Sequence, residues 1–132
     1  MPLFSQAEID AAREREAARN ASLRATTAGE LRTWLTAQDD VADAVIRPDA
    51  PGTVTVRLAD GLLAAVTVST GDVLPPTTAP CAAAHQALAE RIRTWLTGEA
   101  GIGQTWLVPR TAALGVELED GTDFTITVNS RP

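Results

Sequence analysis

A six-residue segment that occurs twice constrains the fold of this chain more than any other feature. Leu31-Arg-Thr-Trp-Leu-Thr36 returns sixty-one positions later as Ile92-Arg-Thr-Trp-Leu-Thr97. After one residue is lost in a loop, an offset of sixty aligns Val56-Arg-Leu-Ala-Asp-Gly61 with Val116-Glu-Leu-Glu-Asp-Gly121. A chain of 132 residues has room for one compact domain. We therefore expect two halves of a single fold, produced by an internal duplication.

The N-terminal region is predicted to be helical from a capping signal. Ser5 followed three residues later by Glu8 is a capping box, and the segment 5–26 is rich in Ala and charged residues that favour a solvated helix. Thr27 and Glu30 form a second capping box, which predicts a fresh helix from Ala28 to about residue 38. The alternative is that Gly29 marks only a bend in one long helix.

The second copy contains a matching helix. Pro80 is expected to start it and Gly98 to stop it, with one apolar stripe over residues 80–97. Because Trp34 and Trp95 occupy equivalent places in the two copies, both are expected to be core residues.

Three strand-like segments follow each helix, at 44–47, 53–58 and 62–69 in the first copy and at 105–108, 114–118 and 122–129 in the second. The later two of each set alternate apolar and polar residues, as half-buried strands do. Directly opposed residues must share a face, so the hairpin loops are predicted to be the three-residue segments 59–61 and 119–121. That length places Gly61 and Gly121 at the left-handed position of a type I turn with a G1 bulge.

These elements predict an α+β fold of the two-layer sandwich type. It consists of an N-terminal charged helix (5–26), repeat one (27–70), a proline-rich connector (71–80) and repeat two (80–130), all in a single domain covering residues 1–132. Each αβββ unit contributes to a mostly antiparallel sheet of about six strands with helices on one face. The opposite, Thr-rich face is expected to be open, with Val45, Arg47, Trp106 and Val108 directed outward.

Composition limits the classes of function. The net charge of -6 disfavours binding to a phosphate backbone, so nucleic acid is an unlikely partner. A single cysteine and a single histidine exclude a cysteine-based zinc site. We expect no cofactor, no membrane span and no secretory signal, and hence a cytoplasmic protein. All eleven basic residues are Arg, which is typical of a high-GC genome, either bacterial or phage.

Two groups of residues suggest chemistry, and each also has a plain structural interpretation. Cys81 and His85 lie one helical turn apart and resemble a nucleophile and a base, but they also fit the buried helix stripe. Carboxylates cluster in two places, without the spacing of a calcium loop. The clusters are Asp39, Asp40 and Asp43, and Glu117, Glu119, Asp120 and Asp123. We therefore expect neither a catalytic nor a metal site.

The leading functional hypothesis is a non-enzymatic interaction module, acting as an adaptor, assembly, chaperone-like or inhibitor protein. It would bind another protein, or a second copy of itself, through the open sheet face, because exposed aromatic and aliphatic side chains mark interfaces. The predicted partner-binding residues are Trp106, Val108, Leu63, Ala65 and Arg57. The alternatives are a structural subunit of a larger particle, such as a phage virion or tail component, and a small enzyme that uses Cys81 or a carboxylate cluster.

Overall fold

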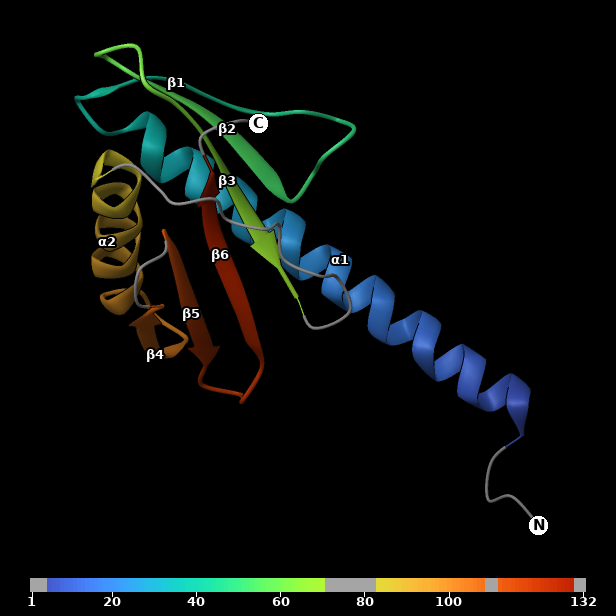
Figure 1. Cartoon of the computed structure of the whole chain (residues 1–132). Helices are drawn as coiled ribbons and strands as arrows, with labels where there is room; N and C mark the ends of the chain where they lie inside the picture. The colour runs from blue at the N-terminus through green and yellow to red at the C-terminus, as the bar shows by residue number, and fades with distance from the viewer. Residues whose placement is uncertain (1–4, 71–82, 109–111, 130–132) are drawn as a thin grey trace.

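The computed structural model describes residues 5–70, 83–108 and 112–129, and shows an α+β fold in which two helices pack against one sheet (Figure 1). The helices are α1 (Gln6–Thr36) and α2 (Ala83–Thr97). The strands are β1 (Val41–Ile46), β2 (Thr53–Leu58), β3 (Leu63–Ser69), β4 (Ile102–Leu107), β5 (Ala113–Leu118) and β6 (Asp123–Asn129). The predicted connector (71–80) and the start of the second predicted helix lie outside the described residues.

The helix α1 is continuous over 31 residues. Its predicted beginning is confirmed, because Ser5 Oγ accepts from the Glu8 backbone and the Glu8 carboxylate accepts from the Ser5 backbone. A separate helix starting at Ala28 is wrong, and the alternative of one long helix is correct. Thr27 and Ala28 are buried in line with Leu31 and Leu35, so packing against the sheet holds this turn helical and the second capping box is not used.

The six strands form one sheet with the order β1-β2-β3-β6-β5-β4, and all neighbours are antiparallel. From either edge to the centre, the sheet contains the first, second and third strand of one half of the chain: β1, β2 and β3 from one edge, and β4, β5 and β6 from the other. The two third strands, β3 and β6, pair at the centre, where Val66 lies opposite Val128 and Thr67 opposite Thr127. Backbone hydrogen bonds therefore join the two halves of the chain along their whole central seam.

Both three-residue hairpin loops are confirmed. Val56 pairs with Ala64 and Val116 with Phe124, and the loop glycines have φ values of 92° at Gly61 and 89° at Gly121. Each loop is tightened by its aspartate, because the side chains of Asp60 and Asp120 accept a hydrogen bond from the backbone two residues on, at 2.9 Å.

The first strand of each half begins about three residues earlier than the sequence predicted. The reason is a register shift between Val41 and Asp43 in β1 and between Ile102 and Gln104 in β4. A bulge of this kind interrupts the period-two alternation by which strands are recognised, so only the part after the bulge was visible in the sequence.

The core lies between the two helices and one face of the sheet, as the alternation predicted. Both helices contribute to the same buried cluster as the valine face, so neither of them covers the opposite face. The fully buried large side chains are Leu31, Leu35, Leu88, Ile92, Leu114, Ile126, Val54, Val56, Val66, Val68, Val116 and Val128.

The two repeated tryptophans lie where the helices meet. Trp34 of α1 and Trp95 of α2 are stacked, with ring centroids 5.1 Å apart and ring planes 15° from parallel. Both rings pack against the core but are only partly buried. They pack against the core from both helices, as expected, but they are not fully buried, and their contact with each other links the two helices directly.

Candidate functional site

The largest exposed apolar side chains of the sheet lie on the face that the helices leave uncovered. Trp106 of β4 is 43% exposed and Val108, just beyond the end of β4, is 37% exposed. On the opposite edge strand, Val45 is 43% exposed and Arg47 is exposed. The predicted outward orientation of these four residues is confirmed.

The indole of Trp106 extends over the neighbouring strand because that strand has a glycine opposite it. Trp106 pairs with Gly115 of β5, and a Cβ added to Gly115 would lie 2.6 Å from Trp106 Nε1 and nearer still to two ring carbons. The indole therefore occupies the space that any side chain at position 115 would need. In the first half the corresponding pair is Val45 with Thr55, so the aromatic platform exists on one half only.

Leu63 and Arg57 form a second exposed group rather than an extension of the first. They are directly opposed on β3 and β2, and Leu63 is 46% exposed. Trp106 pairs with Gly115, Gly115 with Thr125, and Thr125 with Ser69. Trp106 and Ser69 therefore lie in one row of paired residues that runs across the strands. At about 3.3 Å per residue, the six steps along β3 separate this row from Leu63 by roughly 20 Å.

The prediction that Ala65 is exposed is wrong. Ala65 is only 3% exposed, and on the same face Ser69 is 4% and Thr127 is 1% exposed. These short side chains belong to the central strands β3 and β6. The accessible part of this face is consequently its margins, at Trp106 and Val108 on one side and Leu63 with Arg57 on the other.

The predicted cysteine–histidine pair is only half described. Cys81 lies outside the described residues. His85 is 3% exposed, and its Nε2 lies 3.3 Å from the Leu63 carbonyl oxygen, while Nδ1 has no hydrogen-bond partner among the described residues. The imidazole is thus fixed between α2 and the start of β3.

The two carboxylate clusters are divided between turns and an ion pair. Asp40 forms a two-pronged pair with Arg91 of α2, at 2.7 and 3.0 Å, and these hydrogen bonds hold the pKa of Asp40 below its ordinary value. Hydrogen bonds from Thr122 lower the pKa of Asp120. Within residues 5–70, 83–108 and 112–129, no three His, Cys, Asp or Glu side chains are grouped closely enough to hold a metal ion.

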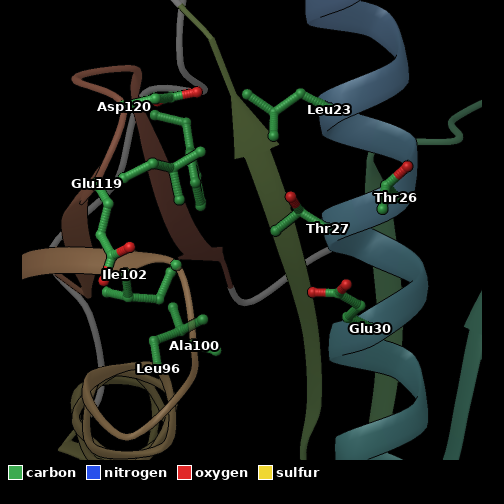
Figure 2. Close-up of a pocket in the computed structure, with 12 residues that line it drawn as sticks. Leu23, Thr26, Thr27, Glu30, Leu96, Ala100, Ile102, Glu119 and Asp120 are labelled. Carbon is green, nitrogen blue, oxygen red and sulfur yellow. The ribbon is translucent and has the colours of Figure 1, made fainter.

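A pocket of about 400 Å³ lies between α1 and the second half of the sheet. Figure 2 shows Thr27 and Glu30 projecting from α1 toward the opposite wall, where Ile102 and Glu119 lie. The apolar part of its lining comes from Leu23, Leu96, Ile102, Leu118 and Phe124. Sequence reasoning missed this site, because its residues come from a helix and a hairpin about ninety positions apart in the chain.

Comparison with known proteins gave no relationship: no family model, no curated protein and no solved structure matches this chain. Neither described helix is long and apolar enough to cross a lipid bilayer.

Proposed function

We propose that this protein is a non-enzymatic interaction module that binds another protein through the sheet face opposite the helices, with Trp106 as the main contact. The observation that supports this is the placement of a half-exposed indole over Gly115. A ring held in place by its own sheet loses little side-chain entropy on binding, and tryptophan is among the residues most often found as energetic hot spots.

The dimensions of the face suit an interface of ordinary size. Trp106 and Leu63 are separated by roughly 20 Å along the strands and by three strand spacings of about 4.8 Å across them. The diagonal is therefore about 25 Å, close to the width of a patch of about 800 Å², which is the usual contribution of one partner. Between these margins Thr67 is partly exposed, whereas Ala65, Ser69 and Thr127 are buried, so the contact would be concentrated at the two margins.

The test compares two substitutions of exposed apolar residues with arginine. Trp106→Arg is expected to weaken partner binding by about 30-fold or more, as loss of a hot spot does. Ile9 is also an exposed apolar residue, with 36% of its surface accessible, but it lies on the remote end of α1. Ile9→Arg should therefore leave binding unchanged. Partners retained by affinity capture from the native host are identified by mass spectrometry, and self-association is measured by light scattering. Equal retention by both variants would contradict the proposal.

A structural subunit of a larger particle is the second candidate, and the form of α1 favours it. From Gln6 to Ser22 no residue of α1 is buried, and this part of the helix extends away from the sheet (Figure 1). From Glu16 onward α1 adjoins the β5–β6 hairpin. The ten residues of α1 before Glu16, at 1.5 Å each, present about 15 Å of bare helix suitable for docking on a neighbour. For such a subunit the effects of the two variants are exchanged: Ile9→Arg would disrupt assembly, and Trp106→Arg would not.

We further propose that the two halves arose from one duplicated αβββ unit. The repeated sequence segments, the mirrored strand order and the matching bulges and hairpins support this origin. An isolated second half, residues 80–132, would then retain the means to pair β6 with β6 of another copy. Analytical ultracentrifugation should find it as a folded dimer, and an unfolded monomer would argue against interchangeable halves.

A further inference from the structure

The two halves of the molecule differ at one junction between helix and sheet. In the first half, Arg91 of α2 reaches over to Asp40 and also donates to Gln38 Oε1 at 3.4 Å. Nearby on α2, Leu88 is 1% exposed and packs in the core. This junction therefore contains a cation, its carboxylate and a large apolar side chain.

The positions that correspond to this junction in the second half line the pocket instead. Glu30 lies sixty-one residues before Arg91, and Gly101 lies sixty-one residues after Asp40. Both Glu30 and Gly101 are in the pocket wall. Thr27 takes the place of Leu88. A carboxylate thus replaces the guanidinium, a glycine replaces its partner, and a shorter polar residue replaces the leucine, so the pocket occupies the space that these groups fill in the other half.

Thr27 supplies a buried polar group within the pocket. It is 7% exposed, and Figure 2 shows its side chain directed from α1 into the pocket. Four other helical threonines donate their hydroxyls to the carbonyl one turn earlier. These are Thr33, Thr36, Thr94 and Thr97. Among the described residues, no hydrogen bond of this kind engages the hydroxyl of Thr27, which lines the pocket and can therefore bond to a ligand or water there.

The charge around the pocket is negative. Glu30, Glu119 and Asp120 belong to its lining, and no basic side chain of the described part of the chain does. Glu16 and Arg19 lie beyond the rim, in an adjoining hollow that also includes Asp120. The charge of Arg19 acts on Asp120, so Glu30 and Glu119 supply the negative charge of the pocket. The remaining surface is the apolar floor described above. Such a site favours a ligand with a positive head and an aliphatic stem.

We propose that this pocket binds a guanidinium or primary ammonium group on a short aliphatic stem, the chemistry that Arg91 provides within the chain at the corresponding junction. Glu30 and Glu119 would receive the cation, the Thr27 hydroxyl would accept one of its N–H groups, and the stem would contact Leu23 and Phe124. The group can be the arginine side chain of a partner or a free alkylguanidine. This site is separate from the sheet face and does not depend on the function proposed for that face.

The test is an NMR titration of the full chain, following the backbone amides of Gly101 and Glu119. The probes are N-acetyl-argininamide, butylguanidinium and, as the neutral isostere, N-acetyl-citrullinamide. Both cations are expected to shift these amides saturably with a Kd of about 1 mM, the range for ligands of this size, and to bind more weakly at high ionic strength. Binding of argininamide alone assigns the site to a protein side chain, whereas equal binding of butylguanidinium assigns it to free guanidines as well.

Two variants separate the pocket from the general acidity of the surface. Glu30→Gln changes an exposed residue and should raise Kd about tenfold, as loss of a charge-assisted hydrogen bond does. Thr27→Leu fills the pocket with the residue found at position 88 and should abolish saturable binding, with far-UV circular dichroism as the check on folding. The proposal is overturned if citrullinamide binds as tightly as argininamide, if neither cation shifts the two amides, or if Glu30→Gln leaves Kd unchanged.

Discussion

Replacing Gly115 by alanine should destabilise the protein, and the cause should be the ring of Trp106 alone. The glycine does not have a positive φ, so alanine meets no backbone strain there. Its Cβ would instead overlap the indole, which must move off β5. At 43% exposure, more than half of the ring surface is covered, or roughly 140 Å² of a tryptophan.

The magnitude follows from two opposing effects. At about 25 cal/mol per Å², complete loss of that contact would cost at most about 3.5 kcal/mol. A displaced indole keeps part of its contact, and alanine in a strand is favoured over glycine by about 0.5–1 kcal/mol. We therefore expect Gly115→Ala to lower the free energy of unfolding by about 1–2 kcal/mol. In a Trp106→Ala background the overlap is gone, and the same substitution should raise it by about 0.5 kcal/mol.

The measurement is urea unfolding followed by far-UV circular dichroism for the four members of this double-mutant cycle. Gly29→Ala is the matched control, because a Cβ at Gly29 meets nothing within 4 Å and alanine is the better helix former by about 0.8–1 kcal/mol. It should stabilise the chain whether or not Trp106 is present. A Gly115→Ala effect of the same size and sign in both Trp106 backgrounds would refute the proposed packing.

Three further predictions concern the helices and the junction between them. Because the pKa of Asp40 is lowered by Arg91, the stabilisation from this pair should be complete above the unfolded-state pKa and be lost as pH falls through the folded one. Asp40→Asn should thus cost about 0.2–1 kcal/mol at neutral pH, given that both side chains are partly exposed, and nothing at strongly acidic pH; urea titrations at both pH values measure this. A double-mutant cycle replacing Trp34 and Trp95 with leucine should give a coupling of about 0.5–1.5 kcal/mol, and additive effects would argue against the stack. Limited trypsin digestion should cut the N-terminal half of α1 first, since it has no buried residues, and protection there in the free monomer would indicate that this half of α1 is packed.

The sequence was sufficient for features that depend on local periodicity. The alternation in Val54–Leu58 and Leu63–Val68 determined the buried face, and the requirement that opposed residues share that face determined the loop length ending at Gly61. A one-residue error would have turned a strand inside out. Local pattern and tertiary structure agree at these positions, so the prediction succeeded.

Prediction failed where tertiary packing overrides a local signal. Thr27 with Glu30 is typical of a helix start, yet contact with the sheet keeps this turn in the middle of α1. Ala65 lies on the predicted outer face but is buried, and alternation along one strand contains no information on the surroundings of a methyl group. The pocket had one available signal. A comparison of the two halves of the sequence where they differ, especially Glu30 against Arg91, marks the junction that is not closed.

The pairing of β3 with β6 also affects how the protein is made. During translation, β3 is synthesised more than fifty residues before its partner, and until Asp123–Asn129 leaves the ribosome its outer edge has no strand to bind. The nascent chain consequently carries an unpaired edge, the usual starting point for aggregation, while the sixty residues from Thr70 to Asn129 are synthesised. An mRNA truncated just before the codons of β6 would yield a product that aggregates rather than a smaller stable protein.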